Sequence, residues 1–156
     1  MIKAFISDLS GVLLSIKDKS YTGKLNALHE DLIAKGDYDF WLFFVLNEEL
    51  ISFYKSINKD INCYLLTRKY IQDYPPLAEK LKGVFKETFI GDRLGYKKDD
   101  PRAYQVIIEK INVSAEEILY LDDNRDNLEV AQKVGIKTIQ YKFNTQAIEE
   151  ITKTIT

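Results

Sequence analysis

The feature that most constrains the fold of this chain is a regular alternation between short apolar runs and longer amphipathic segments. Short apolar runs bounded by turn residues are typical of buried parallel strands. We expect strands near residues 2–7, 61–66, 87–91, 117–121 and 136–141. We expect helices over residues 47–58, 76–83, 101–111, 126–134 and 145–152. The alternation predicts a three-layer α/β fold, with a Rossmann-like parallel sheet and helices on both of its faces.

The composition of the chain excludes several classes of protein. A chain of 156 residues with 46% hydrophobic content can bury one core, and a net charge of −2 without basic blocks disfavours nucleic-acid binding. The longest apolar run, Phe40–Leu46, is far shorter than the ~20 residues that span a bilayer. The single Cys63 cannot form an internal disulfide, and a first strand close to Met1 leaves no room for a signal peptide. We therefore expect a soluble, cytoplasmic monomer or homodimer that binds neither nucleic acid nor membranes.

Residues 15–46 do not follow the strand–helix alternation. Tyr21–Lys35 has the pattern of a helix, and His29 is expected to be exposed on its polar surface. The aromatic run Phe40–Leu46 favours core packing or a dimer interface over a substrate pocket. Residues 15–46 therefore form an insert between the first predicted strand and the rest of the α/β fold.

Acidic residues end two of the predicted strands. The apolar run from Ile118 ends in Asp122 and Asp123, and the first strand ends at Asp8. Because the carboxyl ends of parallel strands meet at one edge of the sheet, these three carboxylates should lie together. Adjacent carboxylates repel each other unless a cation lies between them, so the sequence predicts a metal site at this edge.

A hydroxyl and a lysine complete this set of groups. Thr67 and Arg68 follow a third strand, and Lys98 lies in the loop before a helix; the glycine three residues earlier favours Lys98 over Lys97. The set suits phosphoryl transfer, in which Asp8 attacks phosphorus to form an aspartyl-phosphate. The metal would reduce the repulsion between the two anions, and Thr67 and Lys98 would hold the phosphoryl oxygens. Taken singly, each group has a structural alternative: a helix cap, a surface charge or a solvated acidic turn.

Taken together, these segments resemble the haloacid dehalogenase (HAD) superfamily of hydrolases. The four matching segments are Asp8-Leu-Ser10-Gly11-Val12, Thr67, Gly95-x-x-Lys98 with Asp100-Pro101, and Asp122-Asp123-x-x-x-Asn127. The resemblance covers roughly residues 2–14 and 47–142. It implies that residues 1–14 and 47–156 form the α/β core and that residues 15–46 form a small helical cap.

The resemblance also implies a Mg²⁺ cofactor and its ligands. Asp8 would be both the nucleophile and a ligand, and the backbone carbonyl of Ser10 would be a second ligand. The acid pair would supply a third ligand, with Asp123 favoured over Asp122.

The same resemblance assigns the residues around the substrate. Thr67 and Arg68 would bind the phosphoryl group, and Lys98 would orient the nucleophile and stabilise the transition state. The implied function is a Mg²⁺-dependent phosphatase that acts on a small phosphorylated metabolite.

Ser10 departs from the family pattern. Phosphatases of this family usually carry a second aspartate there, which protonates the leaving oxygen and then activates water. A serine hydroxyl is a poor acid, and general acid–base catalysis contributes about 10²–10⁴-fold to the rate. We therefore expect acyl and aryl phosphates to react better than alkyl phosphates, unless a cap residue such as Glu30 or Asp31 supplies the acid.

The departure at Ser10 leaves other functions open. One is a catalytically weak or inactive protein that keeps the fold and binds phosphate or a partner. A dehalogenase is disfavoured because that chemistry needs no metal and so no acid pair. A phosphonate hydrolase would require a cap lysine, for which Lys24 and Lys35 are the candidates.

Overall fold

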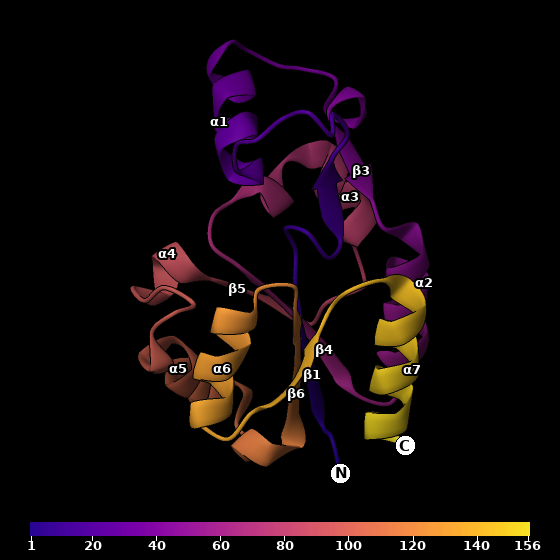
Figure 1. Cartoon of the computed structure of the whole chain (residues 1–156), viewed down its shortest axis with the longest axis vertical. Helices are drawn as coiled ribbons and strands as arrows, with labels where there is room; N and C mark the ends of the chain where they lie inside the picture. Colours follow the sequence, from indigo (N-terminus) through magenta and orange to yellow (C-terminus); the bar gives the residue numbers. More distant parts are fainter.

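The computed structural model describes residues 1–156 and contains a five-stranded parallel sheet in the order β5-β4-β1-β6-β7. In that order the strands are Glu87–Ile90, Asn62–Thr67, Ala4–Asp8, Ile118–Asp122 and Lys137–Gln140. The central strand β1 pairs in parallel with both β4 and β6 (Figure 1). All five expected strands are present, and the predicted parallel sheet is confirmed.

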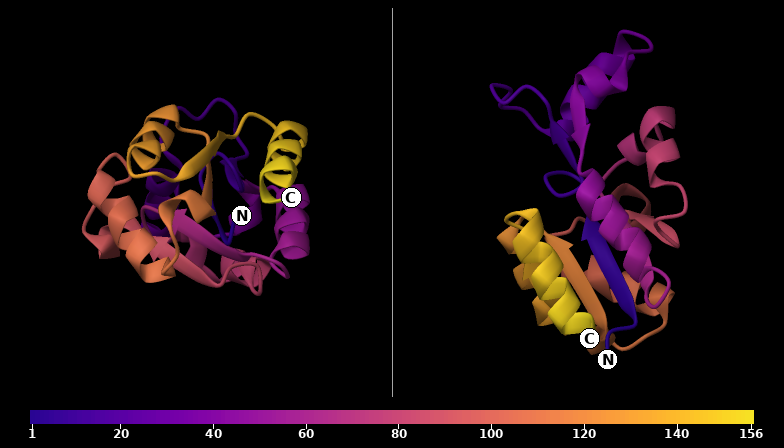
Figure 2. Two further views of the ribbon diagram at one scale, coloured as in Figure 1. Left: turned by 90° about the horizontal axis from the view of Figure 1, so that it is seen from below. Right: turned by 90° about the vertical axis from the view of Figure 1, so that its right-hand side faces the viewer.

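Helices cover both faces of the sheet. The buried side chains of α2, α3 and α7 pack with Phe5, Leu65 and Leu121 in one apolar cluster. Those of α5 and α6 pack with Ile6 and Tyr120 in a second cluster on the other face. The helix bounds, from α2 to α7 in chain order, are Glu48–Ile57, Pro75–Leu81, Gly91–Leu94, Pro101–Ile111, Arg125–Lys133 and Asn144–Ile155. The three-layer arrangement is visible in Figure 2, and it confirms the predicted fold class.

The segment between β1 and α2 extends beyond the carboxyl edge of the sheet (Figure 1). It contains α1, Leu25–Ala34, and an antiparallel ribbon of β2, Leu14–Ile16, with β3, Phe44–Leu46. The helix is shorter than the expected Tyr21–Lys35. The ribbon was not predicted, because strands of three residues are too short to show an alternating pattern. We keep the term cap for residues 15–46 as an interpretation of this segment.

The expectation that His29 is exposed is wrong. Its side chain is buried and forms a 2.6 Å hydrogen bond between Nδ1 and the Tyr38 hydroxyl. Its ring also packs edge-on against Tyr74, with ring centroids 5.1 Å apart. Helix α1 therefore folds back onto aromatic side chains that follow it in the chain.

The aromatic run contributes to the core, as expected. Phe40 and Phe44 are buried and stack on each other, whereas Leu42 remains exposed. Cys63 is a free, buried thiol. No helix in the structure has the length and apolar character needed to cross a membrane.

Candidate active site

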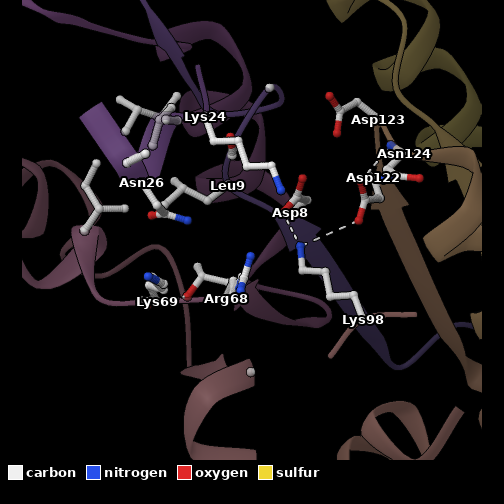
Figure 3. A pocket seen from close by; sticks show the side chains of 18 of the residues that line it. Asp8, Leu9, Lys24, Asn26, Arg68, Lys69, Lys98, Asp122, Asp123 and Asn124 are labelled. Atoms are coloured by element: carbon white, nitrogen blue, oxygen red, sulfur yellow. Dashed lines mark hydrogen bonds and ion pairs between the residues drawn. The ribbon is translucent and has the colours of Figure 1, made fainter. Parts of the chain in front are cut away.

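Asp8 and Lys98 form the centre of the site. Asp8 is the buried last residue of β1, and its carboxylate accepts a hydrogen bond from the Lys98 ammonium (Figure 3). The same ammonium lies 3.6 Å from a carboxylate oxygen of Asp122, so the lysine joins the ends of β1 and β6. Lys98, and not the exposed Lys97, is the lysine that faces the nucleophile candidate.

A left-handed glycine helps to place this lysine. Gly95 ends the short helix α4 with a φ of +77°, a conformation that favours glycine. The chain then turns toward α5, where Pro101 occupies the first turn and the Asp100 side chain caps the helix. Lys98 lies in this turn, between two helix ends that fix its backbone.

Asp122 is a fully buried carboxylate held by donors. It accepts hydrogen bonds from the Tyr120 hydroxyl, the Asn124 amide at 2.8 Å and the Asn127 side chain at 3.1 Å. Burial raises the pKa of Asp122, but Lys98 and these hydrogen bonds outweigh that effect and hold the pKa below its usual value. Asp122 is therefore ionised and acts as a rigid anchor for Lys98.

Asp8 and Asp123 are in the opposite electrostatic situation. Burial raises the pKa of Asp8 to about 7, because the lowering by Lys98 is countered by Asp122 and Asp123. Burial raises the pKa of Asp123 to about 6, and among the neighbouring groups Asp122 contributes most to this increase. Carboxylate oxygens of the three aspartates lie within 4.8 Å of one another. The Lys98 ammonium contacts two of these three carboxylates, so the cluster keeps a net negative charge and fits a hard cation with oxygen ligands.

Gly11 allows this cluster to close. Its φ is +79°, and a β-carbon at this position would overlap the Asp123 carboxylate. A glycine after Ser10 therefore lets the loop following β1 approach the loop following β6. Ser10 lines the same cavity as the three aspartates.

The remaining predicted residues line that cavity, which measures about 1140 Å³. Thr67 is buried at the end of β4, and its hydroxyl donates to the Lys69 carbonyl at 2.9 Å. Arg68 is exposed and lines the cavity, and Figure 3 shows its side chain below Asp8, between Lys69 and Lys98. All the sequence-predicted site residues therefore meet at one edge of the sheet.

Two residues that support the site were missed by the sequence analysis. Tyr120 precedes Asp122 by two residues, so both side chains point to the same face of β6. Asn124 contributes its backbone amide to Asp122 and caps helix α6 through its side chain. The two-residue period of a strand could have suggested Tyr120, whereas the role of Asn124 depends on the turn that follows β6.

A comparison with family models identifies the class of protein to which this fold belongs. Residues 37–135, more than half of the chain, match the model described as "Hydrolase: haloacid dehalogenase-like hydrolase". The chain belongs to the HAD-like hydrolases.

Several curated proteins share parts of the sequence. "Phosphorylated carbohydrates phosphatase" of Thermotoga maritima is 30% identical over 59 residues, which are 38% of this chain and 27% of that protein. "Enolase-phosphatase E1" of Persephonella marina is 34% identical over 73 residues, 40% of this chain and 31% of that protein. Mouse "Acyl-CoA dehydrogenase family member 10" is 31% identical over 80 residues, 51% of this chain and 7% of that protein. The chain thus spans less than a third of the length of each of these relatives.

Solved structures show the same fold over nearly the whole chain. A HAD-superfamily hydrolase of subfamily IA from Geobacter sulfurreducens has a TM-score of 0.72 at 16% identity, covering 98% of this chain and 100% of that one. A predicted HAD-like hydrolase from Porphyromonas gingivalis has a TM-score of 0.71 at 17% identity, with 99% and 98% covered. A HAD family enzyme from Bacteroides thetaiotaomicron, in complex with magnesium and inorganic phosphate, has a TM-score of 0.70 at 18% identity, with 91% and 95% covered.

Proposed function

We propose that this protein is a Mg²⁺-dependent phosphatase that acts on a small phosphorylated metabolite through an aspartyl-phosphate at Asp8. The observation that carries the proposal is the pairing of Asp8 with Lys98 inside a cluster of three carboxylates at the wall of a large cavity. Two relatives are named as phosphatases, which supports the same reaction class.

Asp8, Asp123 and the Ser10 carbonyl are the residues that would hold the magnesium ion. Their oxygen donors suit this hard cation, and burial together with the neighbouring carboxylates raises the pKa values of Asp8 and Asp123, so a bound cation would favour their ionised forms. When bound, the ion supplies positive charge that offsets the repulsion between the Asp8 carboxylate and an anionic phosphoryl group.

The chain's own residues account for the covalent steps. A carboxylate oxygen of Asp8 forms a bond to phosphorus while the bond from phosphorus to the leaving oxygen breaks. Lys98 holds the attacking carboxylate in position and is itself fixed by Asp122. Water then attacks the same phosphorus, which releases inorganic phosphate and regenerates Asp8. Arg68 and Thr67 lie on the cavity wall where they can hold phosphoryl oxygens.

The Thr67 assignment needs one adjustment of the hydrogen bonds. Its hydroxyl now donates to the Lys69 carbonyl, so in the complex the hydroxyl would rotate to donate to a phosphoryl oxygen instead. The structural alternative for Thr67 was that its hydroxyl caps the next helix. The hydroxyl does not do so, because the short helix Ile71–Asp73 that follows has no side-chain cap.

The proposal is tested by hydrolysis of acetyl phosphate and p-nitrophenyl phosphate with Mg²⁺ and with a chelator. We expect release of inorganic phosphate that requires Mg²⁺ and is abolished in Asp8→Asn. A screen of phosphorylated metabolites on the active protein would then identify the substrate. Activity that persists in purified Asp8→Asn would overturn the proposed role of Asp8.

A second candidate function is a phosphate- or partner-binding protein that keeps the fold without turnover. Ser10 favours this candidate, because the aspartate that supplies acid catalysis in family phosphatases is missing. The same assay separates the two: a binding protein would bind inorganic phosphate in the presence of Mg²⁺ but hydrolyse neither substrate.

A further inference from the structure

Lys24 lies on the cap side of the cavity, opposite the catalytic edge of the sheet. It immediately precedes helix α1, and Figure 3 shows its side chain extending toward Asp8. Lys24 lines the same cavity as Asp8, and no carboxylate oxygen lies within 4.0 Å of its ammonium. By contrast, Lys69 is paired with Glu30 at 2.7 Å. Lys24 therefore presents an unneutralised ammonium group to the reaction site.

Geometry requires that a proton donor for the leaving group lie on this side. In phosphoryl transfer the attacking and leaving oxygens are roughly in line across phosphorus. Because Asp8 attacks from the end of β1, the leaving oxygen must point away from the sheet and toward the cap. Lys24 extends into the cavity from that direction.

The carboxyl groups of the cap are poor candidates for this proton. Glu30 is engaged with Lys69, and Asp31 does not line the cavity. Asp18 lines the cavity, but hydrogen bonds from the Ser20 side chain and backbone hold the pKa of its carboxyl below the usual value. Two cap lysines that line the cavity, Lys19 and Lys24, have no carboxylate partner, and Figure 3 shows the Lys24 side chain extending toward Asp8.

We propose that Lys24 is the general acid of this protein and replaces the carboxylic acid that Ser10 cannot supply. This inference rests on the proposed phosphatase function. As Asp8 bonds to phosphorus, the bond to the leaving oxygen breaks and an ammonium proton of Lys24 moves to that oxygen, giving an alcohol and a neutral amine. The amine then takes a proton from the water that attacks the aspartyl-phosphate, which restores the ammonium.

The acid strength of an ammonium group predicts how strongly proton donation by Lys24 accelerates the reaction. An alkylammonium is a weaker acid than a carboxylic acid but a far stronger one than the alcohol that leaves. Lys24 therefore assists alkyl phosphates partly, and acyl phosphates, whose leaving group needs little protonation, depend on it less.

The test compares glycerol phosphate with acetyl phosphate as substrates of the Mg²⁺-loaded protein. In Lys24→Met we expect the ratio of acetyl phosphate to glycerol phosphate turnover to rise at least about tenfold, the lower part of what general acid catalysis contributes. Lys35→Met is the matched control: this lysine ends the same helix but does not line the cavity, so the ratio should not change. Thermal melting in Mg²⁺ checks that each variant is folded.

Two further variants separate proton donation from positive charge. Lys24→Arg keeps the charge, but a guanidinium does not release its proton, so it should resemble Lys24→Met. Ser10→Asp in the Lys24→Met background places a carboxylic acid near the same oxygen, so it should restore glycerol phosphate turnover. If Lys24 had a purely structural role, Ser10→Asp would raise glycerol phosphate turnover by the same factor with and without Lys24, whereas a shared role predicts a larger increase in the Lys24→Met background.

Three results would overturn the inference: an equal loss on both substrates in Lys24→Met, no loss on either, or full activity in Lys24→Arg. An equal loss would assign Lys24 to phosphoryl binding. Failure of the proposed function is distinguishable, because it would appear as a wild type that hydrolyses neither substrate or as an active Asp8→Asn variant.

Discussion

At the scale of single residues, Asp122 and Asp123 are adjacent in the chain but face different surroundings. Asp122 is fully buried, accepts three hydrogen bonds and contacts Lys98. Asp123 is exposed to the cavity, and its pKa is raised. The two carboxylates should therefore have separate functions, one as an anchor and one as a metal ligand.

We predict that the two Asn variants separate these functions. Asp123→Asn should weaken Mg²⁺ binding more than Asp122→Asn does, because a neutral amide is a poor ligand for this ion. Asp122→Asn should lower the free energy of unfolding by about 1–3 kcal/mol, because it disturbs donors that are buried around the carboxylate. Calorimetric titration with Mg²⁺ and urea unfolding measure the two effects. Equal loss of Mg²⁺ affinity in both variants would contradict the division.

The raised pKa values of Asp8 and Asp123 predict how stability depends on pH. Both carboxyl groups have an ordinary pKa of 3.8, and in the metal-free fold their pKa values are raised to about 7 and about 6. At pH values between the ordinary and the raised pKa, the folded chain therefore binds more protons than the unfolded chain. Their contribution to stability therefore falls as pH rises from about 4 to about 7. Mg²⁺ should raise the melting temperature more at pH 8 than at pH 5, because it needs deprotonated ligands.

Thermal melts with Mg²⁺ or a chelator across this pH range check the prediction. The Asp8→Asn/Asp123→Asn double variant is the control, since the difference between it and the wild type isolates these two groups from others such as His29. A Mg²⁺ effect of the same size in the double variant would rule out the assigned ligands.

At the scale of elements, the cap helix α1 is held by aromatic packing. Tyr38 stacks on Tyr74 with rings 5.3 Å apart and bonds to His29, and Lys69 pairs with Glu30 on the same helix. These contacts join the helix to the segment that follows β4. They also hold the backbone from which Lys24 extends.

We predict that Tyr38→Phe costs about 1 kcal/mol of unfolding free energy, because it removes only one hydrogen bond. His29→Ala should cost more, about 1–3 kcal/mol, because it also removes buried ring contacts. Leu42→Ala, at a side chain that is 64% exposed, is the control and should change stability by less than about 0.5 kcal/mol. Urea unfolding measures all three, and a His29→Ala effect no larger than the control would show that α1 is not held in this way.

At the scale of the whole molecule, the sheet was predictable because each of its strands is a local apolar run. β1 and β6 are buried along their whole length, so each appears in the sequence as a short, largely apolar run. The ribbon of β2 and β3 was not predictable, because three-residue strands carry no period and pair across about thirty residues. The burial of His29 was missed for a related reason: it depends on Tyr74, which lies far away in the chain.

The site was predictable to the extent that strand ends define it. Asp8, Thr67 and Asp122 end parallel strands, so topology alone brings them to one edge. The position of Lys24 could not be derived in this way, because it depends on how the cap segment folds over that edge. Its proximity to the reaction site is a property of the three-dimensional structure only.

The measurement that tests the central claim most directly is detection of a phosphoryl group on Asp8. Acid-quenched protein from a reaction with acetyl phosphate and Mg²⁺ would be digested and analysed by peptide mass spectrometry, with Asp8→Asn treated in parallel. We predict a phosphorylated peptide that contains Asp8, formed only with Mg²⁺ and absent from the variant. Turnover of acetyl phosphate with no such peptide at any quench time, or an equally phosphorylated Asp8→Asn variant, would contradict the proposed mechanism.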